Sequence, residues 1–119
     1  MKCLIIVKAT KDSEAGAMPD KELLDAMGKY NAALIKAGIM KDAGGLKPTS
    51  HARRVRFSGA DRSVIDGPFT PTAEQVAGYW IWDVKSMDEA VEWLKRCPNP
   101  MLVDSDIEIR PVYEASDFE

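Results

Sequence analysis

The chain has 119 residues, enough for one domain that buries a hydrophobic core without disulfides or bound metal as staples. Its composition, 45% hydrophobic and 29% charged, is that of a globular protein, and no apolar run could span a membrane. We therefore predict a soluble cytoplasmic domain over residues 1–119 with no membrane partner. The net charge of −3 argues against direct nucleic-acid binding across the domain.

Metal and cofactor sites are also not expected. The chain has one histidine and two cysteines, and the cysteines lack CxxC spacing, so these three residues alone cannot complete a four-ligand zinc site. The sequence contains neither a phosphate-binding glycine loop nor a Ser or Cys nucleophile motif. We therefore predict no metal and no cofactor.

The first predicted strand covers about residues 2–9 and is apolar on both faces, because Cys3–Val7 contains no polar residue. The run is too short for a signal peptide and is followed directly by Lys8. Other residues must therefore pack against both faces of this strand.

A loop over residues 10–18 precedes an amphipathic helix that opens at Pro19-Asp20. Gly38 lies where a left-handed C-terminal cap is expected. The apolar stripe of the helix recurs at steps of three and four: Leu23, Met27, Tyr30, Leu34 and Ala37.

Residues 39–50 show little periodicity, and we interpret them as a loop that folds over a site. A hairpin is predicted next, with arms over 53–58 and 62–66. In its first arm the apolar Val55 and Phe57 are expected to point inward, with arginines on the opposite face.

The stretch Asp66-Gly67-Pro68-Phe69 must end the hairpin, because Gly-Pro can continue neither a helix nor a central strand. An aromatic strand with two apolar faces follows over about residues 78–84. A second helix begins at the capping residue Ser86 and stops at Pro98. A last strand covers about 106–112, before an acidic tail at about 114–119 that we expect to fray.

The predicted order is strand, helix, hairpin, strand, helix, strand. This is the α+β, ferredoxin-like βαββαβ plan with an antiparallel sheet and an elaborated central hairpin. Two helices cover only one face of such a sheet, and a large apolar face left open usually marks an interface. We therefore predict a homodimer through the open sheet face.

Four motifs in register carry a resemblance over nearly the whole chain. They are Asp66–Phe69, Gly78–Trp80, Ser86–Ala90 leading to Arg96-Cys97-Pro98, and Glu108–Pro111. In this order they resemble the DGPF-domain branch of the YCII-related family. The resemblance implies a dimeric α+β barrel. It also implies kinship with uncharacterised proteins, some proposed to be enzymes with a His-Asp pair in a pocket and some resembling partners of extracytoplasmic-function sigma factors.

The chain departs from the branch after the phenylalanine. Where the branch usually has Glu-Thr-Lys-Glu, this chain has Pro71-Thr72-Ala73-Glu74, which keeps Glu74 and loses an acid and a lysine. A role for those two lost side chains therefore does not carry over.

Asp66 and His51 are the candidate catalytic residues. Partial burial of Asp66 against nearby rings would suit a general acid or base. Alternatively, Asp66 bonds only the backbone of its own turn, as such residues often do. His51 is the only imidazole and becomes relevant only if it faces Asp66.

The candidate binding residues are of two kinds. Arg56 and Arg110 could clamp a carboxylate or phosphate of a small anionic ligand, or could form ordinary ion pairs. The other candidates are two aromatic residues that could line a pocket, Phe69 and Trp80, and the retained acid Glu74. Trp80 is expected in the core or at the dimer interface first and in a pocket wall second.

Two functions remain open. One is a cofactor-free small-molecule enzyme using acid/base chemistry, of the isomerase or lactone type, near Asp66. The alternative is a non-catalytic ligand-binding or regulatory module associated with a transcription factor. The two differ in that the enzyme needs a desolvated Asp66 beside a second titratable group, whereas the module needs only an apolar cleft. A purely structural dimer is a third possibility.

Overall fold

Strand β1 (Lys2–Lys8) lies at the centre of the main sheet in the computed structural model, which describes residues 1–119. It pairs antiparallel with β5 (Val76–Asp83) on one side and with β6 (Ile107–Pro111) on the other. Strand β2 (Met40–Gly45) pairs with the outer edge of β5, which gives the order β2-β5-β1-β6. The antiparallel four-stranded sheet with two crossing helices is consistent with the predicted ferredoxin-like α+β fold.

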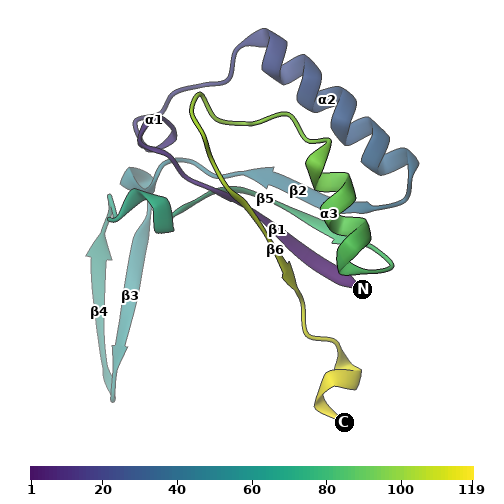
Figure 1. The fold of residues 1–119 in the computed structure, drawn as a ribbon. Helices are drawn as coiled ribbons and strands as arrows, with labels where there is room; N and C mark the ends of the chain where they lie inside the picture. The colour runs from purple at the N-terminus through teal and green to yellow at the C-terminus, as the bar shows by residue number, and fades with distance from the viewer.

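Helices α2 (Lys21–Lys36) and α3 (Met87–Lys95) both lie on the same face of the sheet (Figure 1). Each begins as the sequence predicts, because the side chains of Asp20 and Ser86 accept backbone N–H bonds three residues later. None of the helices is both long and apolar enough to span a lipid bilayer.

The hydrophobic core lies between the helices and the covered face of the sheet. At its centre, the rings of Tyr30 and Trp80 meet edge to face with centroids 6.1 Å apart. The Tyr30 hydroxyl donates a 2.7 Å hydrogen bond to the Trp93 carbonyl, which ties α2 to α3. Burial raises the pKa of Tyr30, so the phenol stays protonated and keeps this bond at neutral pH. The buried cluster contains Cys3, Ile5, Val7, Tyr30, Leu34, Ile39, Trp80, Trp82, Val84 and Ala90.

The prediction of a loop over residues 39–50 is wrong in its first half, which contains β2. The sequence of β2 lacks the branched and aromatic residues typical of strands, and the partner strand β5 decides its conformation through the ladder bonds. Gly44 lies opposite Tyr79, and a Cβ atom there would come 2.9 Å from the tyrosine ring. The close approach of β2 to the Tyr79 ring therefore requires glycine at residue 44. The same glycine lowers the strand propensity of the segment, so the sequence gives little indication of a strand there.

The hairpin is also placed differently from the prediction. Its strands β3 (Arg53–Ser58) and β4 (Asp61–Asp66) form where expected, but they make a separate two-stranded sheet and do not join the main sheet. Val55 and Phe57 do not point into the core, and their side chains are exposed. The hairpin is thus an insertion between β2 and β5 that stands away from the main sheet (Figure 1).

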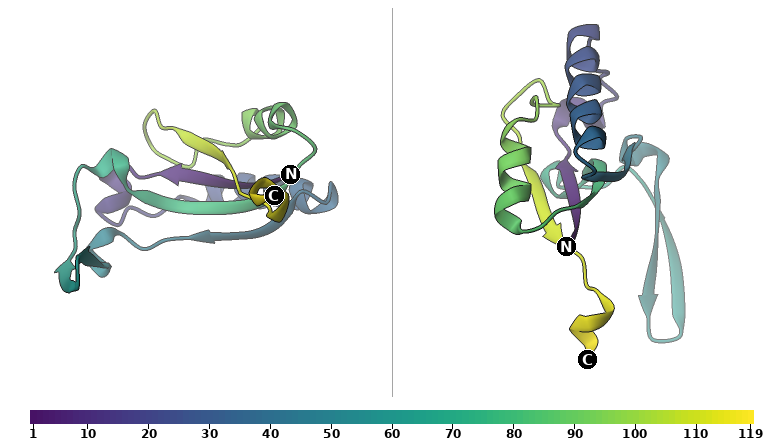
Figure 2. Two further views of the ribbon diagram at one scale, coloured as in Figure 1. Left: turned by 90° about the horizontal axis from the view of Figure 1, so that it is seen from below. Right: turned by 90° about the vertical axis from the view of Figure 1, so that its right-hand side faces the viewer.

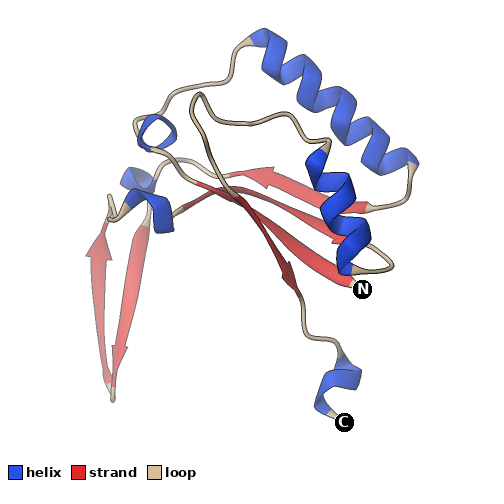
Figure 3. Cartoon of the chain, viewed as in Figure 1, coloured by secondary structure: helices blue, strands red, loops and turns tan.

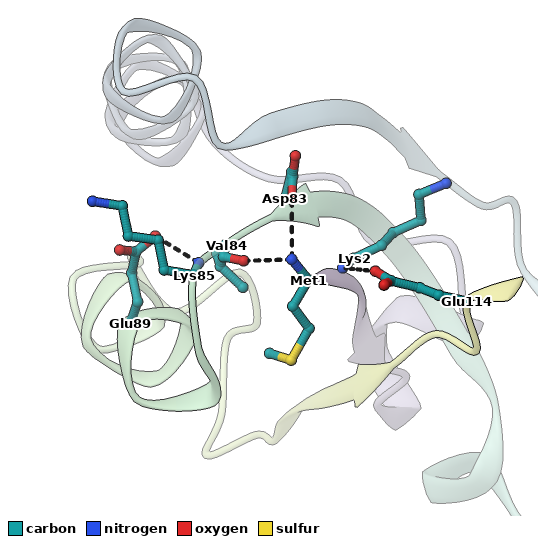
Figure 4. A network of polar contacts seen from close by, with 7 residues as sticks. All are labelled: Met1, Lys2, Asp83, Val84, Lys85, Glu89 and Glu114. Atoms are coloured by element: carbon teal, nitrogen blue, oxygen red, sulfur yellow. Dashed lines mark hydrogen bonds and ion pairs between the residues drawn. The ribbon is translucent and has the colours of Figure 1, made fainter. Parts of the chain in front are cut away.

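Polar contacts hold the two chain ends against the sheet (Figure 4). The amino group of Met1 donates to the Val84 carbonyl at 2.8 Å and pairs with Asp83 at 3.3 Å. The backbone N–H of Lys2 donates to the Glu114 carboxylate at 3.3 Å. The tail that we expected to fray contains one exposed 3-10 turn, η3 (Ala115–Phe118).

The other face of the main sheet has no helix over it, as Figure 2 shows from below. Leu4 and Ile6 of β1 lie on this face beside Ile81 and Tyr79 of β5, and all four side chains are half-buried. The open apolar face that the sequence predicts is therefore present. The dimeric barrel remains a prediction.

The Tyr30 hydrogen bond leads to a test of how the helices are joined. Tyr30→Phe should lower the free energy of unfolding by about 1 kcal/mol, the usual net value of one hydrogen bond, because the ring packing is kept and only the bond is lost. Urea unfolding followed by tryptophan fluorescence measures this loss. Tyr113→Phe is the matched control, because Tyr113 is exposed and its substitution should leave stability unchanged. Equal effects of the two substitutions would contradict the role of the Tyr30 bond.

Candidate functional site

A cavity of about 660 Å³ lies on the helix side of the main sheet, next to the ends of β1 and β2. Four segments far apart in the sequence form its walls. They are the loop around the short helix α1 (Lys11–Glu14), the first half of α2, the segment after β2, and the loop before β6. Figure 3 shows these connecting loops beside α2. The cavity is therefore a product of the tertiary fold.

Most of the cavity wall is apolar, and Trp80 supplies an aromatic side. The indole N–H of Trp80 donates to the Asn31 side-chain oxygen at 2.9 Å, which fixes the orientation of the ring. Trp80 belongs to the buried core cluster and also lines the cavity, and its role in binding a ligand remains a prediction. Other apolar side chains of the wall are Val7, Leu23, Met27, Leu46, Met101 and Leu102.

One end of the cavity carries two carboxylates from α1, Asp12 and Glu14. Glu14 accepts the Thr49 backbone N–H at 3.1 Å and also the Thr49 hydroxyl, so it has a structural partner. Asp12 is half-buried, and its carboxylate has no hydrogen bond or ion pair within the chain. We did not single out these residues in the sequence, because the loop shows no periodicity. The only available signal is the capping box of Thr10 and Ser13 that starts α1.

The turn Asp66–Phe69 docks on the 3-10 turn η1 (Thr49–His51). The Thr49 hydroxyl accepts the Phe69 backbone N–H at 2.9 Å, and the Gly67 N–H donates to the Ala52 carbonyl at 2.9 Å. A Cβ atom at residue 67 would overlap the Thr49 carbonyl, so only glycine fits there. This turn therefore joins the hairpin to the rest of the domain through the same Thr49 that holds Glu14.

Asp66 itself lies on the surface at the base of the hairpin. Its side chain is 77% exposed and pairs with Arg53 across the strands at 3.1 Å. The partial burial expected from the sequence is therefore not found in the single chain, because the aromatic strand lies in the main sheet and away from the hairpin. His51 is exposed as well, and no hydrogen bond joins it to Asp66. The catalytic roles of both residues remain predictions.

The predicted binding residues do not gather at one place. Arg56 is exposed on β3, and Arg110 pairs with Glu108 on its own strand at 3.3 Å, the alternative that the sequence left open. Glu74 is exposed in the 3-10 turn η2 (Thr72–Glu74). Of the predicted site residues only Trp80 lines the cavity.

The Phe69 ring packs beneath a cationic side chain of the same chain, and its predicted role in binding remains a prediction. Its ring is buried, and the Arg54 guanidinium lies over it at 3.8 Å from the ring centre. This contact adds to the docking of the turn. Phe69 is therefore occupied by the protein's own side chain.

Cys97 lines a second cavity of about 490 Å³ between α3 and β6. Burial raises the pKa of its thiol to about 11. The thiolate is the nucleophilic form, so this cysteine is protonated and unreactive at neutral pH. Nowhere do three metal-binding side chains of the His, Cys, Asp and Glu type come together.

The observed sheet, its two covering helices and the loop-walled cavity define a small α+β domain of the ferredoxin-like class. The model of the YCII-related domain matches residues 1–116, so this chain belongs to the YCII-related family. It is also 29% identical to "Uncharacterized protein R00369" of Rhizobium meliloti (strain 1021) over 93 aligned residues. The aligned region covers 78% of this chain and 75% of that protein. The family resemblance read from the sequence is confirmed, and the DGPF branch remains a prediction.

Gly67 tests whether the turn is built around close backbone contact. Gly67→Ala should lower the free energy of unfolding by about 2 kcal/mol, because the new methyl group overlaps the Thr49 carbonyl and the turn must move. Gly28→Ala on α2 is the control. It meets no atom and should stabilise the helix by about 0.5–1 kcal/mol. Thermal unfolding of both variants measures the difference, and a tolerated Gly67→Ala would contradict the docking geometry.

Asp66 tests whether its ion pair matters for the fold. Exposed pairs contribute about 0–1 kcal/mol, so Asp66→Asn should leave the free energy of unfolding nearly unchanged in high salt and lower it slightly in low salt. Chemical unfolding at two salt concentrations checks this. A large loss that is independent of salt would show that Asp66 has a buried environment.

Proposed function

We propose that this YCII-related protein is a ligand-binding module whose site is the cavity beside Asp12 and Trp80. The observation that carries the proposal is the cavity itself. Its volume of about 660 Å³ falls within the range of about 300–1,000 Å³ that is usual for small-molecule sites. Mostly apolar walls with a few converging polar groups are the usual composition of such sites. The ligand is accordingly a small and largely apolar organic molecule.

The charges at the cavity indicate the polar part of the ligand. Two carboxylates, Asp12 and Glu14, line the cavity together with one cation, Lys47. Glu14 is already bonded to Thr49, which leaves Asp12 free to accept a hydrogen bond. A neutral ligand with a hydrogen-bond donor fits this arrangement better than the anionic ligand expected from the sequence, because neither Arg56 nor Arg110 lines the cavity.

An acid/base enzyme without a cofactor is the second candidate. The observation in its favour is the half-buried Asp12 carboxylate, which has no partner within the chain and faces an apolar cavity. The form of this hypothesis based on Asp66 needs a desolvated carboxylate, whereas Asp66 in the single chain is exposed. The geometry therefore favours binding over catalysis. Association with an extracytoplasmic-function sigma factor is implied by the family resemblance alone.

The cavity can be tested by filling it. Leu23 lines the cavity, whereas its neighbour Leu24 points to solvent. Leu23→Trp should therefore weaken binding of the neutral, apolar probe N-phenyl-1-naphthylamine by about tenfold or more, which corresponds to about 1.4 kcal/mol. The rise in probe fluorescence on titration measures the affinity.

Leu24→Trp is the matched control, with the same change one residue away, and should bind the probe as the unsubstituted protein does. Circular dichroism of both variants establishes that the fold is retained. Equal probe affinity for the two variants, or no binding by the unsubstituted protein, would contradict the assignment of the cavity as a ligand site.

A further inference from the structure

Asn31 interrupts an apolar row on helix α2. Leu23, Met27 and Asn31 are spaced by four residues, so they share one face of the helix, and all three line the ligand cavity. The leucine and the methionine present only apolar surface to it. Asn31 is half-buried, and its amide carries two N–H donors and one carbonyl acceptor. This side chain therefore brings hydrogen-bonding groups to an otherwise apolar part of the wall.

Trp80 decides which way the Asn31 amide is turned. The indole Nε1–H can only donate, and it lies 2.9 Å from the Asn31 side chain, so the amide oxygen must face the tryptophan and the NH2 group must face away from it. The indole ring is itself held in place, because it is buried and packs against Tyr30 and Trp82 with ring centres 6.1 Å away in each case. The orientation of the Asn31 amide is therefore set before any ligand binds.

The NH2 group of Asn31 has no acceptor within the chain, since the one side-chain hydrogen bond of this residue goes to its oxygen. The nitrogen is not sealed in the core either. Of the buried side-chain nitrogen and oxygen atoms, only Trp82 Nε1 lacks a partner, so the unpaired Asn31 nitrogen is an accessible atom. Because Asn31 lines the cavity, a molecule bound there is placed to accept its N–H bonds.

The other polar side chains at the cavity narrow the choice of ligand. The hydroxyls of Thr10 and Ser13 are engaged in the capping box of α1, and Glu14 already has a structural partner. Asp12 keeps a free carboxylate, which can only accept hydrogen bonds. The cavity thus offers donors at Asn31 and an acceptor at Asp12, from two different helices.

We propose that Asn31 selects the ligand of this cavity by donating its N–H bonds to a carbonyl oxygen. The selectivity depends on the proposed ligand-binding function of the cavity, and it adds the chemical class of the ligand. That class is a neutral, largely apolar molecule with a carbonyl acceptor for Asn31 and a hydrogen-bond donor for Asp12. A molecule without the carbonyl displaces water from the Asn31 donors and leaves them unpaired, which lowers its affinity. Trp80 is a positioning residue, because its N–H sets the orientation of the amide.

Two neutral naphthalene dyes test this selectivity on the full chain. Prodan carries a ketone acceptor and no N–H donor, whereas N-phenyl-1-naphthylamine carries an N–H donor and no carbonyl. Asn31→Leu keeps the approximate size of the side chain and removes the donors. The ratio of the dissociation constant of prodan to that of N-phenyl-1-naphthylamine should therefore rise by about fivefold, the net effect of one hydrogen bond.

Asn31→Asp is a second variant with the same shape. At about pH 8 its carboxylate is ionised, so it still accepts the Trp80 N–H but offers the cavity only acceptors. The affinity ratio should again rise by about fivefold or more. Ala32→Asp is the matched control, because Ala32 is exposed, does not line the cavity and receives the same charge. Its affinity ratio should equal that of the unsubstituted protein, and circular dichroism establishes that each variant is folded.

Prodan also reports the bond to its carbonyl directly, because its emission moves to longer wavelength when that oxygen accepts a hydrogen bond. Prodan bound to the unsubstituted protein should emit at longer wavelength than prodan bound to Asn31→Leu. A purely structural Asn31 would not produce this difference.

The selectivity is overturned if both Asn31 variants leave the affinity ratio unchanged, or if bound prodan emits at the same wavelength with and without the Asn31 amide. It is also overturned if the unsubstituted chain binds N-phenyl-1-naphthylamine but not prodan. In these cases the cavity remains a ligand site. Binding of neither dye by the unsubstituted chain would instead overturn the ligand-binding function, and the role of Asn31 with it.

Discussion

The antiparallel ladder around β1 is the constraint on which the rest of the structure depends. β1 holds β5 and β6 on its two sides, and β5 in turn holds β2, whose own sequence has little strand preference. The same ladder brings Ile5 and Trp80 side by side on the covered face, where the helices bury them. Because β1 is apolar on both faces, one face is buried by α2 and α3 and the other is left partly exposed. The hydrophobic core and the open sheet face therefore both follow from the apolar sequence of β1.

Thr49 connects the cavity wall to the base of the hairpin. Its backbone N–H and hydroxyl donate to Glu14 at the cavity, and the same hydroxyl accepts the Phe69 N–H from the turn below the hairpin. The cavity wall and the base of the hairpin are thus joined by one buried side chain. Networks of this kind are rigid when each member is satisfied. The Asp66–Phe69 motif therefore acts mainly through Gly67 and Phe69, which set the position of the hairpin, while Asp66 points to solvent.

The candidate site is less predictable from the sequence than the fold. Both long helices, their caps and the hairpin bounds follow from local patterns, since apolar periodicity, capping side chains and turn residues act within a few positions. The cavity combines α1, α2, the end of β2 and the loop before β6, which are separated by tens of residues. Asp12 lies in a short helix without an apolar stripe, and only the fold shows that it faces the cavity beside Trp80. The chemistry inferred from Asp66 and the arginines needs neighbouring side chains that the single chain does not bring to them, and their functional roles remain predictions.

By itself, the sequence determined the α+β class, the two helices with their buried stripes, the hairpin and the family, because each is encoded in local periodicity or in motifs read along the chain. Only the tertiary structure decided which strands pair. β2 forms because its backbone pairs with the edge of β5. The hairpin does not join the main sheet, although its sequence has a higher strand propensity than that of β2. Strand pairing is a non-local choice, made by the hydrogen bonds and the packing available at each sheet edge. For the same reason the alternation in β3 correctly predicted an apolar face but could not show that nothing within the same chain covers it.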